Sequence, residues 1–261
     1  MTTKNVNNTE NERGKVMDDK IFTLISNENI ANGVYKAVLS GDTSAITVPG
    51  QFVNLKLDGL YLRRPISVCD CEGERLTLIY KVVGEGTEQM SEMTGGERLD
   101  VLTGLGNGFS VSKCQGDDVL LVGGGVGVPP LYMLCKRLIE AGKRVTVVCG
   151  FASAADVFYE QEFAALGAKV YIATADGSYG TKGFVTDVIK GLSGYTYFYS
   201  CGPIPMFKAM ETVVNSSGQY SFEERMGCGF GACMGCSCET KYGNKRICRD
   251  GPVLEREEVI W

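Results

Sequence analysis

The chain has 261 residues, enough for two domains, and its 44% hydrophobic and 22% charged residues are typical of a globular protein rather than a disordered chain or a coiled coil. Its net charge of −5 argues against nucleic acid as a partner, because proteins that bind phosphate backbones usually carry a basic surplus. The sequence contains no histidine, which excludes His-ligated haem, Rieske centres, His-containing zinc sites and Ser-His-Asp triads.

The first segment, residues 1–18, is polar and is predicted to be a disordered lead without a signal peptide, and Met17 is an alternative start. The longest uncharged stretches, 119–135 and 191–207, are shorter than the ~20 residues of a membrane span and contain glycine and proline. The eleven cysteines are an odd number and do not suggest a disulfide framework. We therefore expect a cytoplasmic protein with no membrane segment.

Residues 19–114 contain short β-like runs separated by Gly, Pro and Asp, which predicts an antiparallel β-barrel domain. The runs are 20–30, 33–40, 51–57, 76–83 and 97–105. The barrel region also contains the motif RPIS at 64–67, and Gly86-Thr87 opens a helix-like stretch. A helix N-terminus beside an arginine favours a diphosphate group. Taken alone, the motif is weak, because an ordinary strand with an exposed arginine would look the same.

Residues 115–218 change to an alternation of strands and helices, which predicts a doubly wound, parallel α/β domain. The expected strands are 117–123, 143–151, 168–174 and 195–200, and the expected helices are 129–142, 156–167, 183–192 and 203–217.

A glycine-rich turn at 122–130 follows the first of these strands and opens the first helix, where such sheets bind phosphate and ribose. The turn lacks the last glycine of a G-x-G-x-x-G fingerprint, and a tight strand–helix turn is the alternative interpretation. The candidate nicotinamide-dinucleotide ligands are Gly123, Gly124, Gly125 and Gly127, together with Cys201, Gly202 and Pro203 from a later loop of the same crevice. No Arg or Lys occurs between Cys149 and Glu160, so a clamp for a 2′-phosphate is missing there and NAD is favoured over NADP.

Residues 219–261 hold five of the cysteines, and four of them have the spacing C-x4-C-x2-C-x11-C, which contains the plant-type ligand pattern of a 2Fe–2S cluster. The predicted ligands are Cys228, Cys233, Cys236 and Cys248. Neighbouring glycines supply unusual backbone angles and leave N–H groups free to reach sulfur. A four-cysteine zinc site is the alternative, but it normally has two C-x2-C pairs and this segment has one. We expect the fifth thiol, Cys238, to serve in packing.

Several motifs occur in the order expected of the ferredoxin–NADP reductase superfamily: PGQFVNL, RRPIS, IYKVVGEGT, VGGGVGVPPL and CGPIPM. With ERMGCGFGACMGCSC and ICRDGPV in the tail, residues 20–261 resemble the electron-transfer subunits of the NAD-dependent, type B dihydroorotate dehydrogenases. The resemblance implies an α+β multidomain protein with an FAD-binding barrel, a nicotinamide-binding α/β domain and a small C-terminal 2Fe–2S domain.

The resemblance also implies roles for single residues. Arg64 would neutralise the FAD pyrophosphate, Ser67 would hydrogen-bond near the flavin N5, and Cys201 would face the nicotinamide. The superfamily often has tyrosine where Ile66 stands, which leaves the stacking partner of the flavin open. The other residues implied to hold FAD are Pro65, Ile66, Ile79, Tyr80, Lys81, Gly86 and Thr87.

These three sites imply a mechanism. NADH gives up two electrons together as hydride, whereas an iron–sulfur cluster carries one, so a flavin between them acts as a converter. Hydride transfer needs positioning rather than a side-chain acid or base, which fits the absence of histidine. The chain shows no site of its own for substrate oxidation, so a partner is expected to carry that half-reaction.

The resemblance names the partner as an FMN-containing catalytic dihydroorotate dehydrogenase subunit, in a heterotetramer with two of each chain. Electrons would pass from dihydroorotate and FMN through the cluster and FAD to NAD+ in pyrimidine (UMP) biosynthesis. Two alternatives stay open. One is an NAD(P)H-linked reductase subunit of a hydrogenase, sulfide or ferredoxin-dependent complex, and the other is a non-catalytic α/β scaffold with a zinc-binding tail.

Overall fold

The structure is a computed structural model that describes residues 9–10 and 16–261. Most of the predicted disordered lead, residues 1–18, lies outside the described residues, so the prediction of disorder is not tested there. The described part of that lead already belongs to strands, because the first barrel strand begins at Val16. Within the described residues, no helix is long and apolar enough to cross a membrane.

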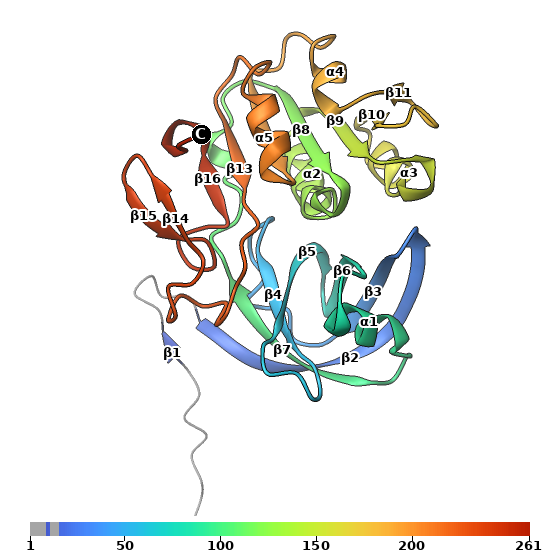
Figure 1. Ribbon diagram of the computed structural model, residues 1–261, viewed down its shortest axis with the longest axis vertical. Coiled ribbons are helices and arrows are strands. Elements are labelled where there is room, and N and C mark those ends of the chain that lie inside the picture. Colours follow the sequence, from blue (N-terminus) through green and yellow to red (C-terminus); the bar gives the residue numbers. More distant parts are fainter. Residues whose placement is uncertain (1–8, 11–15) are drawn as a thin grey trace, which may run out of the picture.

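Six antiparallel strands close into the predicted barrel, which lies below the α/β sheet in Figure 1. Their order is β2–β3–β6–β5–β4–β7, and β7 pairs back with β2. Successive side chains of each strand alternate between the interior and the outer face, and the interior is apolar. The bounds are β1 (Thr9–Glu10, paired with β2), β2 (Val16–Ala31), β3 (Val34–Ser40), β4 (Phe52–Lys56), β5 (Arg64–Glu72), β6 (Arg75–Lys81), α1 (Glu85–Glu92) and β7 (Arg98–Leu105).

The second sheet has the order β11–β10–β9–β8–β12–β13–β16 and is parallel except at β16, which confirms the predicted α/β domain. The chain runs outward from β8 on one side and returns to β12 on the other, so the strand order reverses between β8 and β12. Open α/β sheets bind ligands at such a point. The bounds are β8 (Asp118–Gly124), α2 (Pro130–Glu140), β9 (Arg144–Phe151), α3 (Glu160–Ala165), β10 (Lys169–Thr174), β11 (Thr181–Lys182), α4 (Val185–Ile189), β12 (Tyr197–Cys201) and α5 (Ile204–Met210), with one-turn 3-10 helices η1 (Val111–Lys113), η2 (Gly125–Gly127) and η3 (Ala154–Asp156).

The C-terminal segment completes this sheet. The strand β13 (Gly218–Ser221) pairs with β12, and β16 (Val253–Glu255) pairs with β13 from the far side. Between them lie the cysteine loop and the hairpin of β14 (Ser237–Thr240) and β15 (Gly243–Arg246), and the one-turn helix η4 (Arg256–Glu258) follows. The predicted boundary between residues 218 and 219 therefore falls inside β13.

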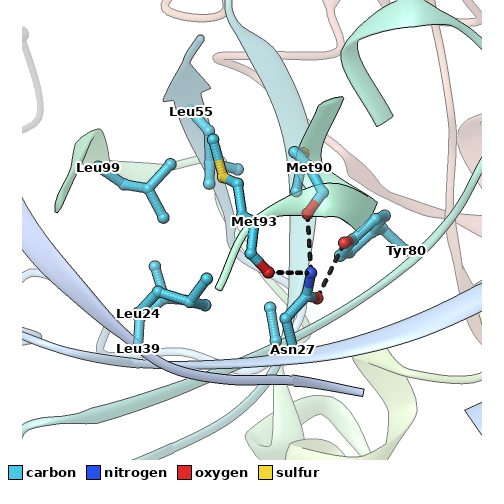
Figure 2. Close-up of a pocket in the computed structure, with 9 residues that line it drawn as sticks. Leu24, Asn27, Leu39, Leu55, Tyr80, Met90, Met93 and Leu99 are labelled. Carbon is cyan, nitrogen blue, oxygen red and sulfur yellow. Dashed lines mark hydrogen bonds between the residues drawn. The ribbon is translucent and has the colours of Figure 1, made fainter. Parts of the chain in front are cut away.

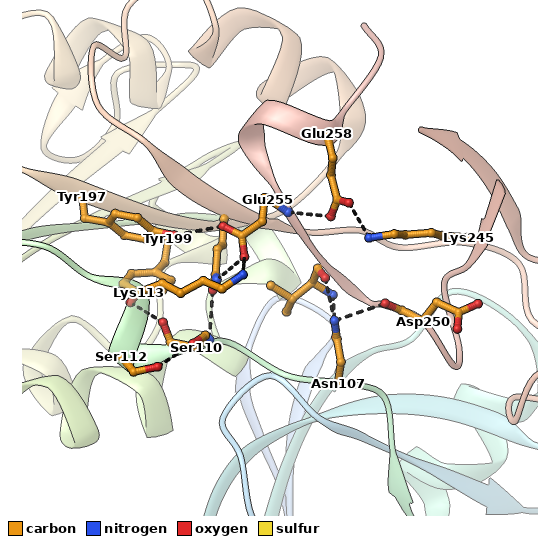
Figure 3. Close-up of polar contacts among 12 residues, drawn as sticks. Asn107, Ser110, Ser112, Lys113, Tyr197, Tyr199, Lys245, Asp250, Glu255 and Glu258 are labelled. Atoms are coloured by element: carbon orange, nitrogen blue, oxygen red, sulfur yellow. Dashed lines mark hydrogen bonds and ion pairs between the residues drawn. The ribbon is translucent and has the colours of Figure 1, made fainter. Parts of the chain in front are cut away.

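The segment that leads from the barrel to the sheet is fastened to the C-terminal segment by polar contacts (Figure 3). The Asn107 side chain donates to the carbonyl of Val253 at 2.8 Å and accepts from its N–H at 3.1 Å. Six residues further on, Lys113 reaches the Glu255 carboxylate at 2.6 Å, and Gln219 donates to the same carboxylate at 2.8 Å. These bonds connect barrel, sheet and tail at one junction.

Candidate functional site

The predicted diphosphate site is assembled by β5 and α1. A Cβ placed on Gly86 would lie 2.1 Å from Nε of Arg64, so the guanidinium rests directly on the first turn of α1. The Thr87 hydroxyl accepts the N–H groups of Val83 (2.9 Å) and Gly84 (3.2 Å), and it therefore shapes this turn from within. The structure places a cation at a helix N-terminus, as a diphosphate requires. The role of these residues in binding FAD stays a prediction.

The RPIS segment alternates between two environments along β5. Ser67 lies across from Phe52 of β4, and Ile66 lies across from Val53, which is fully buried in the barrel. Ile66 packs against the same apolar core, whereas Pro65 and Ser67 share the opposite face of the strand. Ile66 therefore contributes to barrel packing.

Tyr80 has a structural position inside the barrel. Its hydroxyl donates to Oδ1 of Asn27 at 2.9 Å, and Nδ2 of Asn27 donates to the carbonyls of Met90 (2.8 Å) and Met93 (3.2 Å), as Figure 2 shows. The Tyr80 ring also stacks on Tyr35 with centroids 5.8 Å apart. Burial raises the pKa of Tyr80 to about 12. Through Asn27, the Tyr80 side chain thus connects the barrel wall to α1. The predicted cofactor contact of Tyr80 would then be made by its backbone.

Ile79 and Lys81 point to the other face of β6, toward the α/β domain. Ile79 is buried and belongs to the core that fills that domain. Nζ of Lys81 lies 3.8 Å from Oδ1 of Asp156, the last residue of the one-turn helix η3 that follows β9. These two predicted FAD ligands therefore lie where barrel and α/β domain meet.

The predicted nicotinamide residues come together at the carboxyl ends of β8 and β12. Cys201 is the register partner of Gly123, and a Cβ on Gly127 would lie 2.2 Å from the carbonyl oxygen of Cys201. A Cβ on Gly124 would lie 3.2 Å from Cδ of Pro203. The two loops thus touch backbone to backbone, at the point where the strand order reverses. All seven predicted residues lie at the carboxyl ends of β8 and β12 or in the segments that directly follow them: Gly123, Gly124, Gly125, Gly127, Cys201, Gly202 and Pro203.

Cys201 has neighbours that the sequence motifs did not indicate. Burial raises the pKa of its thiol to about 12, a hydrogen bond with Ser221 acts in the opposite direction, and the charge of Glu223 raises it further. Ser221 is the register partner of Cys201 on β13. Only the pairing of β12 with β13 brings these residues together, because they lie twenty positions apart in the chain. Cys201 is therefore a neutral thiol at physiological pH.

The cysteine loop directs backbone N–H groups at sulfur. The N–H groups of Ala232 and Cys233 lie 3.2 and 3.4 Å from Sγ of Cys228. Burial opposes ionisation of Cys228, but these and further backbone hydrogen bonds outweigh it and lower the pKa of the thiol to about 6. The N–H of Gly235 lies 3.5 Å from Sγ of Cys233. A site that stabilises thiolate suits a metal ligand, because cysteine binds metals in that form.

The four predicted ligands form two pairs. Cys228 and Cys233 are hydrogen-bonded near the surface, whereas Cys236 and Cys248 are hydrogen-bonded and buried. Two pairs of thiols fit the four ligands of a two-iron cluster. No group of three or more Cys, Asp or Glu side chains within residues 9–10 and 16–261 is arranged to hold one metal ion.

The fifth thiol of the segment lies apart from these pairs. Cys238 is on β14, packs against the apolar core shared by the sheet and the tail, and contacts the carbonyl of Glu239 at 3.6 Å. This position agrees with the packing role expected from the sequence.

Two family models match the chain. Residues 223–260 match the iron-sulfur cluster binding domain of dihydroorotate dehydrogenase B, and residues 121–212 match the oxidoreductase NAD-binding domain. The first match favours the iron–sulfur cluster over the zinc alternative.

Curated relatives match over nearly the full chain. The electron transfer subunit of dihydroorotate dehydrogenase B (NAD(+)) from Shouchella clausii is 48% identical, covering 92% of this chain and 97% of the relative. The subunit from Bacillus velezensis is 49% identical, covering 91% and 97%. This chain belongs to the family of dihydroorotate dehydrogenase B (NAD+) electron transfer subunits. The family resemblance predicted from the motifs is confirmed, and the chain is an oxidoreductase subunit with a 2Fe–2S cluster and FAD as its cofactors and NAD as its co-substrate.

Solved structures confirm the predicted fold class. The NADH-dependent reduced ferredoxin-NADP oxidoreductase aligns with a TM-score of 0.84 and 30% identity over 92% of this chain and 90% of that chain. A ferredoxin NADP+ reductase from Neisseria gonorrhoeae, with bound FAD and NADP, aligns with a TM-score of 0.64 and 16% identity over 74% and 90%. This electron transfer subunit therefore has the ferredoxin–NADP reductase fold with an iron–sulfur segment added at its C-terminus.

Proposed function

We propose that this chain passes electrons between a catalytic dihydroorotate dehydrogenase subunit and NAD+, as part of pyrimidine biosynthesis. The observation that carries the proposal is the contact between the cysteine loop and the barrel: Nδ2 of Asn54 on β4 donates to the carbonyl of Cys228 at 3.4 Å. The strand β4 pairs with β5, which bears Arg64 and Ser67. The candidate cluster site and the candidate flavin strand are thus immediate neighbours.

Each site has a defined task in this proposal. When bound, FAD exchanges hydride with the nicotinamide and single electrons with the cluster. Arg64, above the N-terminal turn of α1, binds the diphosphate, and Ser67 orients the ring edge. The crevice of Gly127 and Cys201 binds the nicotinamide dinucleotide. The four thiolates of the C-terminal segment hold the cluster.

The partner supplies the half-reaction that this chain lacks. Relatives at 43–49% identity carry the name of the electron transfer subunit of dihydroorotate dehydrogenase B (NAD(+)), which supports a catalytic dihydroorotate dehydrogenase subunit as the partner. We propose that this partner contains FMN and forms a heterotetramer with two of each chain. A reductase subunit of a ferredoxin-dependent complex is the second candidate, because a reduced ferredoxin-NADP oxidoreductase is 30% identical. The higher identities favour dihydroorotate as the source of electrons.

We further propose a cytoplasmic location and the domain limits 19–114, 115–218 and 219–261. All eleven cysteines are free, which suits a reducing compartment. The limits follow the barrel, the parallel sheet and the cysteine segment, with β13 shared between the last two.

The proposal is tested by a matched pair of cysteine variants in the complex with the catalytic subunit. Cys233→Ser removes an exposed thiol of the loop, since serine keeps the size but binds iron poorly. We expect it to lose iron and electron transfer from dihydroorotate to NAD+, while NADH still reduces the FAD near the wild-type rate. Cys238→Ser, a change of the same kind in the same segment, should keep both iron and transfer.

The controls separate chemistry from assembly. Because metal binding and folding are coupled, gel filtration must show that Cys233→Ser still binds the catalytic subunit. An assembled, iron-free Cys233→Ser complex that transfers electrons at the wild-type rate would show that the relay assignment is wrong. Reduced ferredoxin replaces dihydroorotate in a parallel assay, and activity with ferredoxin alone would support the second candidate.

A further inference from the structure

Asn54 lies between two residues that fill the barrel, and its own side chain points the other way. Val53 and Leu55 belong to the apolar core of the barrel, and successive side chains on a strand alternate. Phe52, on the same face as Asn54, packs in the apolar cluster that contains Cys236. The outer face of β4 therefore covers the cysteine segment.

Only one of the two polar atoms of the Asn54 side chain has a hydrogen-bond partner. Its Nδ2 donates to the carbonyl of Cys228, whereas its Oδ1 is buried without a hydrogen-bond partner, and the whole residue is 1% exposed. The loop packs closely on this amide, because a Cβ on Gly229 would lie 2.2 Å from Nδ2 and the φ of Gly229 is +78°. A buried polar group without a hydrogen-bond partner is destabilising, so leucine would suit the packing at this position better. What distinguishes Asn54 from the other buried amide of this region, that of Gln51, is its contact with the cysteine loop.

On the strand side, Asn54 is the register partner of Pro65, two residues before Ser67. Cross-strand partners in an antiparallel pair point to the same face. We propose that Asn54 is a positioning residue that fixes the separation between the iron–sulfur loop and the flavin-binding strand. Asn54 lies on β4, which pairs with the candidate flavin strand β5, and its side-chain amide donates to the backbone carbonyl of the predicted cluster ligand Cys228.

This inference rests on the proposed relay and adds a residue to it. With FAD held by the barrel and the cluster held by the four thiolates, single electrons would pass between the two groups, from cluster to flavin in the proposed relay and from flavin to cluster when NADH is the donor, and no bond in the protein would be made or broken. Electron transfer slows steeply as the two centres move apart. A loop released from Asn54 would therefore slow this step and leave hydride transfer from NADH unchanged.

The test uses the full complex and the variant Asn54→Leu, which has a similar volume and no amide. NADH is mixed with the oxidised complex without oxygen, and flavin absorbance and the cluster EPR signal are followed by stopped-flow and rapid freezing. We expect wild-type flavin reduction and a cluster signal that appears several-fold more slowly, because the rate of electron tunnelling falls steeply with the distance between the two centres. Iron, FAD and melting temperature should equal or exceed wild-type values, and the EPR line positions should shift.

Gln51→Leu is the matched control. Gln51 is also 1% exposed and has an unpartnered Nε2, but its Oε1 accepts the N–H groups of Thr47 (2.8 Å) and Val48 (2.9 Å) instead of touching the cysteine loop. We expect this variant to melt earlier and to reduce the cluster at the wild-type rate. A second variant, Asn54→Ser, shortens the side chain and is used if the leucine variant does not fold.

The outcomes are distinct. An Asn54 variant that folds and reduces its cluster at the wild-type rate overturns the inference alone. Loss of iron, FAD and melting temperature together in both Asn54 variants also overturns it, because that result describes a purely structural residue. A wild-type complex whose cluster stays oxidised after flavin reduction would overturn the proposed relay itself.

Discussion

Two glycines of the candidate sites differ in the kind of atom that an added methyl group would contact. At Gly86 the nearest atom is Nε of a flexible arginine, whereas at Gly127 it is the backbone carbonyl of Cys201. A side chain can rotate away from an added methyl group, but two backbone segments must separate. Gly86 therefore allows the Arg64 guanidinium to lie close to α1, and Gly127 allows the loops after β8 and β12 to approach each other closely.

Arg64→Ala should weaken FAD binding. The guanidinium is the cation that lies on the N-terminal turn of α1, and a charge-assisted contact to a diphosphate is worth about 1.5–3 kcal/mol, or roughly a 10- to 150-fold change in affinity. Titration of the apo-protein with FAD, followed by flavin fluorescence, measures this change. Arg75→Ala, which removes an exposed arginine at the start of β6, is the control. Equal affinity in the two variants would remove Arg64 from the site.

Gly127→Ala should impair the nicotinamide site. The new methyl group would lie 2.2 Å from the carbonyl oxygen of Cys201, so the loops after β8 and β12 must move apart. We expect the affinity for NADH to fall roughly tenfold or more, with FAD content unchanged. Flavin reduction at a series of NADH concentrations provides the measurement. Gly191→Ala, whose Cβ would lie 3.5 Å from its nearest neighbour, should behave as wild type.

At the scale of elements, β16 joins the C-terminal segment to both other parts of the molecule. The Glu255 carboxylate at its end accepts from Lys113, Gln219 and, at 3.2 Å, from the hydroxyl of Tyr197 (Figure 3). These donors come from the segment after the barrel and from the middle of the sheet. One carboxylate thus fastens three regions that are separated in the sequence.

Glu255→Ala should therefore lower the free energy of unfolding by about 1–3 kcal/mol, because it leaves the buried donors of Gln219 and Tyr197 without this acceptor. Thermal unfolding followed by circular dichroism measures the loss. Glu257→Ala changes an exposed carboxylate of the adjoining turn and should have little effect. The idea would be refuted by similar melting temperatures for the two variants.

The helices show how much of an element the sequence pattern can predict. The predicted helix 129–142 corresponds to α2 (Pro130–Glu140), but 156–167 shrinks to α3 (Glu160–Ala165) and 203–217 shrinks to α5 (Ile204–Met210). Tyr159, with φ of +66°, immediately precedes α3. Its side chain is buried among aromatic rings, so tertiary packing holds a residue that would otherwise extend the helix. The sequence predicts no separate strand at β5 (Arg64–Glu72), because its polar residues obscure the alternation of apolar and polar side chains that marks a strand.

At the scale of the whole molecule, the buried thiols make stability depend on alkaline pH. Burial raises the pKa of Cys69, Cys135 and Cys201 to about 12, against 9.0 for a free thiol. Between these values the unfolded chain loses protons that the folded protein retains. The stabilising effect of the neutral thiols is therefore complete below pH 9 and is lost as the pH rises toward 12.

We expect the free energy of unfolding to fall above pH 9 by about 1.4 kcal/mol per pH unit for each such thiol. Urea unfolding at a series of pH values, with reductant present, measures the slope. Cys135→Ala should give a shallower slope than wild type, since burial alone raises the pKa of that thiol. A flat profile from pH 9 to 11 would contradict the account.

The sequence by itself determined the family, the barrel, the α/β domain and the four-cysteine segment. These features depend on residue type and spacing over short stretches: C-x4-C-x2-C places three thiols in one loop whatever surrounds it. It also brought out the glycine-rich turn after β8. Such signals are local, so a single sequence is enough to identify them.

Only the tertiary structure decided which residues from distant segments meet. The Tyr80 side chain points into the barrel, β13 and β16 belong to the α/β sheet, and Ser221 lies beside Cys201. The tertiary structure also brought Asn54 against Cys228, 174 positions later in the chain. Strand register and domain packing choose such partners through burial of apolar surface summed over the whole molecule, and no short stretch of sequence contains that sum.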